Sequence, residues 1–205
     1  SFMGRANYNY ADRYMLTFTV RGDGSSRFGK NHRWGCFPSG AVAWRISEEE
    51  FFPEQDAVNA LKLRAGYGMT GSQASVSNYG YLATYETSVY PFGKFSSDPE
   101  EMNKYALIST TLANPDIHWE TVSQANVGFD MTLAYNRLTL GFDWYWKNTT
   151  DMLVKASVPI TSGFEDTSVT YANAGKVRNT GFEVSVNSLN IKNGPVQWET
   201  SLNVT

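Results

Sequence analysis

The sequence is poor in several residue types, and each shortage excludes a class of protein. Only one of its 205 residues is a cysteine, Cys36, which excludes disulfides within the chain and Cys-x-x-Cys metal or redox motifs. The two histidines, His32 and His118, form no HExxH motif, and no G-x-S-x-G motif is present, so we expect neither catalysis nor a bound metal or cofactor. Seventeen basic residues against 20 acidic ones give a net charge of −3, which argues against a nucleic-acid binder.

Long hydrophobic runs are also missing. No stretch of about 18 apolar residues occurs, so a transmembrane helix is not expected. Membrane-spanning strands remain possible, because their alternating pattern leaves only a weak hydropathy signal. The chain begins and ends within apparent strands, and we interpret it as a segment of a longer protein, so the lack of a signal peptide carries no weight.

Aromatic residues, in contrast, are abundant. Phe, Trp and Tyr make up 15% of the chain, yet the mean hydropathy is only −0.38. Large rings in a polar chain require an arrangement that sorts them onto one surface.

Alternation with a period of two residues provides that arrangement. In one segment Leu140, Phe142 and Trp144 alternate with polar residues such as Thr139 and Asp143. Each such segment has about the ten residues that a tilted strand needs to cross a bilayer, and none has helical spacing. The alternating segments are residues 2–10, 14–21, 39–46, 61–68, 126–133, 137–147, 182–187 and 196–204.

The connections between these strands differ in length on the two sides of an up-and-down meander. On one side most are short, and on the other two are long. This asymmetry is typical of outer-membrane barrels and is not expected of a Greek-key sandwich. In chain order the connections are residues 11–12, 22–33, 47–59, 70–116, 134–136, 148–172 and 189–195.

Aromatic positions agree with this interpretation. Tyr10, Tyr14 and Tyr135 lie beside short turns, whereas Trp144 and Trp146 lie toward the other end of their strand. Such placement predicts two girdles at the headgroup levels, although aromatic residues also favour strands in general.

Other motifs have simpler explanations. Residues 66–71 match G-x-G-x-x-G, but no helix is expected after them, so a dinucleotide site is not expected. Residues 23–31 are polar and glycine-rich but lack P-loop and EF-hand spacing. We expect a short helical excursion over 47–53, in which the adjacent residues Glu48, Glu49 and Glu50 are solvated.

The long connection 70–116 is rich in rings. These rings either bind a sugar or peptide ligand or pack against one another, and the sequence favours neither. The candidate ligand-binding residues are Tyr79, Tyr81, Tyr85, Tyr90 and Phe92.

Several phrases together resemble the barrel of SusC/RagA-type TonB-dependent outer-membrane transporters. They occur in the expected order over nearly the whole chain. The phrases are residues 4–17 (GRANYNYADRYMLT), 21–29 (RGDGSSRFG), 37–39 (FPS), 43–49 (AWRISEE), 61–73 (LKLRAGYGMTGSQ), 112–121 (LANPDIHWET) and 173–181 (NAGKVRNTG).

The resemblance implies an outer-membrane barrel of about 22 strands, with an N-terminal plug that is absent from this chain. It also implies import of glycans or peptides, a SusD-type surface lipoprotein as partner, and energy from the TonB complex.

We therefore expect an all-β fold, in which residues 1–205 form about eight strands of a larger transmembrane barrel. Apolar side chains should face outer-membrane lipid. The alternative is a soluble all-β carbohydrate-binding module, which would bury its apolar faces against a second sheet. The residues expected to face the lumen are Arg5, Arg21, Lys62, Arg64, Asp130, Asp143, Lys147 and Glu183.

Overall fold

The computed structural model describes residues 1–53, 57–90, 104–159, 161, 169–191 and 195–205. A 3-10 turn, η1, lies at Ile46–Glu48, where the sequence predicted a short helical excursion. Within the described residues, no helix is long and apolar enough to cross a membrane. The strands are β1 (Phe2–Tyr10), β2 (Tyr14–Gly24), β3 (Trp34–Arg45), β4 (Val58–Ser72), β5 (Thr84–Tyr90), β6 (Lys104–Leu112), β7 (Glu120–Leu133), β8 (Leu138–Thr150), β9 (Leu153–Ser157), β10 (Val169–Asn173), β11 (Val177–Ile191) and β12 (Trp198–Val204).

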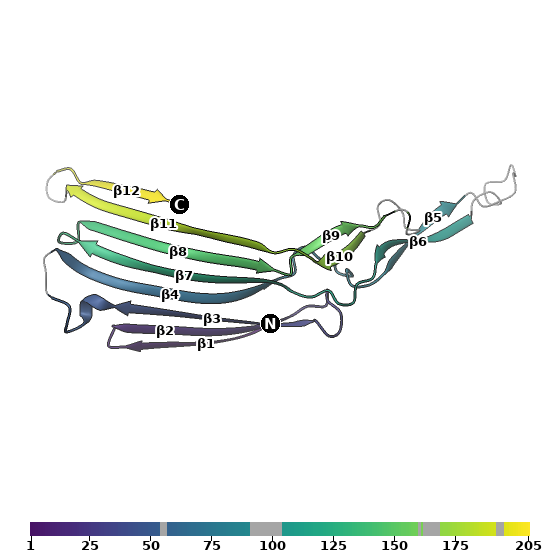
Figure 1. The fold of residues 1–205 in the computed structure, drawn as a ribbon, viewed down its shortest axis with the longest axis horizontal. Coiled ribbons are helices and arrows are strands. Elements are labelled where there is room, and N and C mark those ends of the chain that lie inside the picture. The colour runs from purple at the N-terminus through teal and green to yellow at the C-terminus, as the bar shows by residue number, and fades with distance from the viewer. Residues whose placement is uncertain (54–56, 91–103, 160, 162–168, 192–194) are drawn as a thin grey trace.

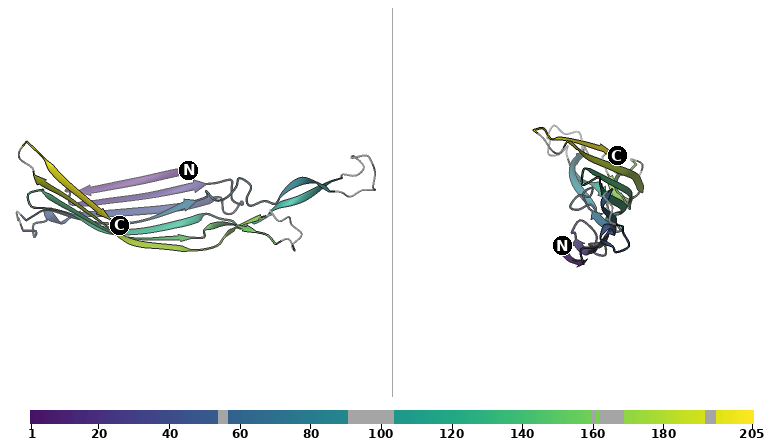
Figure 2. Two further views of the ribbon diagram at one scale, coloured as in Figure 1. Left: turned by 90° about the horizontal axis from the view of Figure 1, so that it is seen from above. Right: turned by 90° about the vertical axis from the view of Figure 1, so that its left-hand side faces the viewer.

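The main body is one eight-stranded sheet in the order β1-β2-β3-β4-β7-β8-β11-β12. Every neighbouring pair is antiparallel, so the chain runs up and down across the sheet (Figure 1). The eight strands form a single curved layer (Figure 2). The predicted antiparallel meander of about eight strands is confirmed.

A second sheet lies beyond one end of the first (Figure 1). It has four strands in the order β5-β6-β10-β9, and β10 pairs in parallel with β6 at only two residue pairs. The expectation that residues 70–116 and 148–172 form loops was therefore incomplete, because both connections contain strands. Their predicted length and their common side of the sheet are confirmed (Figure 1).

The tight turns lie at the opposite end of the large sheet. Residues 11–13 join β1 to β2, and Ala11 and Asp12 have φ values of 50° and 53°. Positive φ at these two adjacent residues gives a turn whose twist matches that of the flanking strands, which allows the short connection between Tyr10 and Tyr14. The β7–β8 turn likewise uses positive φ at residues 134, 135 and 136.

Strand register sorts the side chains of the large sheet onto two faces. Leu63 pairs with Phe129, Phe129 with Phe142, and Phe142 with Val184, so one apolar row crosses four strands. The next row contains Arg64, Gly128, Asp143 and Glu183. Successive strand residues point to opposite sides, so the first row belongs to an apolar face and the second to a polar face.

The buried core does not lie against the large sheet as a second layer. It is a cluster at the junction between the two sheets, formed by the loops and strand ends that meet there. Its members are Phe28, Phe37, Val76, Ile117, Trp119, Leu153 and Tyr171.

Candidate functional site

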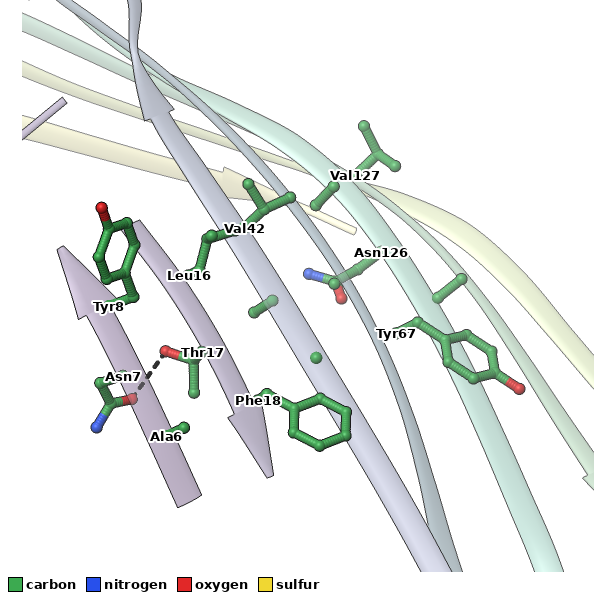
Figure 3. A pocket seen from close by; sticks show the side chains of 15 residues that line it. Ala6, Asn7, Tyr8, Leu16, Thr17, Phe18, Val42, Tyr67, Asn126 and Val127 are labelled. Atoms are coloured by element: carbon green, nitrogen blue, oxygen red, sulfur yellow. Dashed lines mark hydrogen bonds between the residues drawn. The ribbon is translucent and has the colours of Figure 1, made fainter. Parts of the chain in front are cut away.

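The apolar face of the large sheet is uncovered. Phe18, Tyr67, Val127 and Phe182 are each at least half exposed. Figure 3 shows a hollow on this part of the sheet, where Tyr8, Leu16, Phe18, Val42, Tyr67 and Val127 are among the lining residues. A contiguous exposed apolar surface of this kind indicates contact with lipid or with another protein.

Aromatic pairs mark both ends of this face. At the short-turn end, Tyr14 stacks on Trp44 with ring centroids 6.2 Å apart, and Tyr10 lies 6.4 Å from Tyr14. At the other end, Phe2 stacks on Trp34 at 6.0 Å. The rings thus lie where two membrane interfaces would cross the sheet.

Glu49 fixes the turn after η1 to the short-turn end of the sheet. Its Oε1 accepts a hydrogen bond from Trp44 Nε1 at 2.9 Å, and its Oε2 lies 3.6 Å from Arg13 Nη1. Hydrogen bonds from Tyr14 and Trp44 lower the pKa of the Glu49 carboxyl below its usual range. The expectation that all three adjacent glutamates are simply solvated was wrong for Glu49. Tyr14 belongs to another strand, and Trp44 reaches Glu49 only because the turn after η1 folds back on the end of β3.

The register places all eight predicted lumen-facing residues on the polar face. At its centre Arg64 Nη2 lies 2.9 Å from both Asp130 Oδ1 and Asp143 Oδ2. Arg64 Nε is buried and has no acceptor among the described residues. The sequence predicted the shared face of these charges, but not the bridging position of Arg64 between two strands.

Two other arginines that the sequence predicts to face the lumen, Arg5 and Arg21, bind neighbouring side chains on the polar face. Arg5 Nε donates a hydrogen bond to Thr19 Oγ1 at 3.2 Å, and Arg21 Nε lies 2.7 Å from Asp23 Oδ2.

Two side chains from the family-like phrases, Arg27 and Asn173, bind backbone groups of other loops at the junction between the sheets. Arg27 Nη1 donates to the carbonyl oxygens of Gln73 at 3.2 Å and Val76 at 3.1 Å. The backbone N–H of His118 donates a hydrogen bond to Asn173 Oδ1 at 2.9 Å. Asn173 Nδ2 donates in turn to the carbonyl oxygen of His118 at 2.8 Å and to that of Asp151. These bonds hold separate loops together above the strand ends.

The predicted ligand-binding rings have different surroundings. Tyr79 and Tyr85 are 65% and 64% exposed, so both are available to a ligand. Tyr81 packs against the buried cluster, as expected if the loop aromatics pack on one another. Tyr90 ends β5, but its side chain lies outside the described part of the structure, as does Phe92.

The two histidines, distant in sequence, are close in space. Their ring centroids are 5.7 Å apart, and His118 Nδ1 lies 2.9 Å from the Asp116 carbonyl oxygen. Within the described residues, however, no group of three or more His, Cys, Asp or Glu side chains is arranged to hold a metal ion.

With this geometry established, comparison with known proteins identifies the family. The family model described as "TonB dependent receptor-like, beta-barrel" matches residues 1–205. The chain belongs to the TonB-dependent receptor family. This confirms the resemblance found in the sequence.

Named relatives agree. The chain is 40% identical to TonB-dependent receptor P3 of Formosa agariphila over 203 residues, which cover 99% of this chain and 19% of that protein. It is 37% identical to TonB-dependent receptor SusC of Bacteroides thetaiotaomicron, covering all of this chain and 20% of SusC. This segment of a TonB-dependent receptor thus spans about a fifth of the length of these relatives.

Solved structures show the same fold. The RagAB peptide importer in its closed-closed state superposes with a TM-score of 0.81 and 31% identity, over 98% of this chain and 21% of that one. The siderophore receptor PirA of Pseudomonas aeruginosa, at 15% identity, superposes with a TM-score of 0.56 over 98% of this chain and 32% of that one. The latter likeness shows the fold alone.

Proposed function

We propose that this chain is part of the wall of an outer-membrane transporter that imports glycans or peptides with energy delivered through TonB. The observation that carries the proposal is the single-layer sheet with one uncovered apolar face and one charged face. Lipid on one side and a wet lumen on the other would satisfy both faces at once.

On this proposal the eight predicted lumen-facing residues of the polar face line the lumen or contact a plug. The Arg64 bridge supports this role, because the two carboxylates beside Arg64 leave the cluster with one net negative charge while Arg64 Nε still needs an acceptor. An acceptor from a plug or from water in the lumen would meet that need.

We further propose a SusD-type surface lipoprotein as partner. The likeness to SusC and to the RagAB peptide importer supports this assignment. The four-stranded sheet extends past the strand ends on the side of the long connections (Figure 1) and would offer a surface for such contact.

The alternative of a soluble carbohydrate-binding module requires a second sheet packed on the apolar face. In the described residues the second sheet continues past the end of the first and does not cover it (Figures 1 and 2). We therefore do not retain this alternative.

Uptake in cells tests the proposal. The full-length protein should import its glycan or peptide when TonB is present, and removal of TonB should abolish import while the barrel remains in the outer membrane. Import that continues unchanged without TonB would contradict the proposed function.

A further inference from the structure

A second feature of the polar face is a pocket of about 590 Å³ near the ends of the strands that carry the long connections. It lies over β1, β2, β3 and β4, and its lining reaches the loop after β4 and the residue before β7. Its polar lining includes Arg5, Thr19, Arg21, Ser39, Thr70 and Gln73.

The charge balance of this pocket favours an anion. Arg21 Nε is already bound to Asp23, the only acidic residue in the lining. Arg5 forms no salt bridge within the described residues, so its terminal amino groups have no carboxylate partner. The pocket therefore holds one uncompensated guanidinium, whose planar fork matches a carboxylate.

The position of Arg5 is set by a buried hydroxyl. Thr19 lies directly opposite Arg5 in the register and is only 9% exposed. Its Oγ1 accepts the hydrogen bond from Arg5 Nε, so the two terminal amino groups remain available. A guanidinium held in this way loses less conformational entropy when it binds a ligand.

The opposite wall is held in place by packing and hydrogen bonds. Phe37 and Trp119 contact each other edge to face at 5.6 Å, and Gly71 leaves the space that the Phe37 ring occupies. Gln73 is fixed through its carbonyl by Arg27, while its Oε1 is buried and has no donor among the described residues. A ligand with a hydroxyl or amide N–H next to its carboxylate would supply both missing partners.

We propose that this pocket is a subsite for a carboxylate group of the transported ligand, with Arg5 as the binding residue and Thr19 as a positioning residue. This inference rests on the proposed function, because the pocket must face the lumen for the ligand to reach it. Both an acidic glycan and a peptide can supply the carboxylate.

Binding to the purified full-length transporter in detergent tests the subsite. The glycan probes are tetragalacturonate and a neutral galactotetraose, and the peptide probes are a pentapeptide and its C-terminal amide. We expect the wild type to prefer the acidic member of at least one pair, and the pair that shows this preference identifies the source of the carboxylate. Arg5→Gln should weaken binding of that probe about tenfold, or about 1.4 kcal/mol, because a charge-assisted hydrogen bond is lost. Binding of its neutral counterpart should change less than about twofold.

Three further variants sharpen the result. Arg5→Lys should retain part of the preference, since it keeps the charge without the fork. Thr19→Val should lower affinity for the acidic probe less than Arg5→Gln does. Lys62→Gln removes a positive charge from the same face near the short-turn end and should leave both affinities unchanged.

Several outcomes would overturn the subsite. These are equal affinity of the wild type for acidic and neutral probes, no binding of either acidic probe at millimolar concentration, or equal losses for both members of a pair in Arg5→Gln. Equal losses would instead assign Arg5 to a structural contact such as one with a plug. Failure of TonB-dependent uptake in cells would contradict the proposed function but not this detergent measurement, so the two failures are distinguishable.

Discussion

Phe142→Arg is the perturbation that most directly opposes the proposed lipid contact. Phe142 lies on the apolar face in the row that also contains Leu63, Phe129 and Val184. An arginine facing the middle of the bilayer costs about 2–4 kcal/mol. Loss of the stacked pair with Phe129, whose ring centroid is 5.7 Å away, adds about 1 kcal/mol. We therefore expect a total destabilisation of roughly 3–5 kcal/mol.

Two control variants separate these contributions. Phe142→Leu removes the ring pair but introduces no charge, so it should cost only about 1 kcal/mol. Thr139→Arg places the same charge in the same strand but on the polar face, and should change stability by less than about 0.5 kcal/mol.

Urea unfolding of the full-length transporter in lipid vesicles, followed by tryptophan fluorescence, provides the assay. An unchanged midpoint for Phe142→Arg would show that this side chain does not face lipid. Equal destabilisation by Phe142→Arg and Thr139→Arg would show that the two faces do not differ in environment, and would refute the reasoning.

Three other predictions concern the ends of the sheet. Asn173→Ala should speed hydrogen exchange at the His118 amide, because that N–H loses its acceptor, and unchanged protection would contradict a role of the Asn173 side chain in holding the loops together. Glu49 has a lowered folded pKa, so its stabilisation is present above about pH 4.5, the usual value, and is lost as the pH falls through the folded value. Thermal melts of wild type should therefore lose more stability than those of Glu49→Gln on acidification from neutral pH, and parallel losses would count against this role. Gly71→Ala should destabilise by about 1–3 kcal/mol in urea because a Cβ there collides with a buried ring, whereas Gly22→Ala, with open space around it, should not; equal effects would rule out the collision.

The large sheet was predictable because its two faces differ in polarity. In β8, for example, leucines and large rings occupy every second position from Leu138 to Trp146, and most residues between them are polar. That alternation indicates both a strand and which of its residues share a face. The same pattern allowed Asp143 and Glu183 to be assigned to one face, although their strands are joined by a long connection.

The second sheet escaped prediction for a physical reason. β5 (TYETSVY) and β6 (KYALISTTL) pair mainly with each other. Because this pair has no buried face among the described residues, its polar and apolar residues need not alternate clearly. The parallel contact between β10 and β6 comprises two residue pairs and leaves no periodic signal.

The contacts at the loop junction were equally invisible to sequence reasoning. Asn173 acts through hydrogen bonds to backbone groups of His118 and Asp151, and backbone groups carry no sequence signature. The pocket around Arg5 depends on a turn of the chain that brings Gln73 and Trp119 over the strand ends. The sequence pattern suggested that Arg5 lies on the polar face, but only the fold places these neighbours beside it.

Spin-label accessibility along β8 of the full-length transporter in lipid vesicles tests the central claim most directly. Labels would be introduced one at a time at Leu140, Phe142 and Trp144 and at Thr139, Asp143 and Lys147, with native cysteines, including Cys36, replaced. If the apolar face contacts lipid, the first set will be accessible to oxygen and shielded from a water-soluble nickel reagent, and the second set will show the reverse preference. Shielding of the first set from both reagents, as in a dry protein interior, would contradict the account.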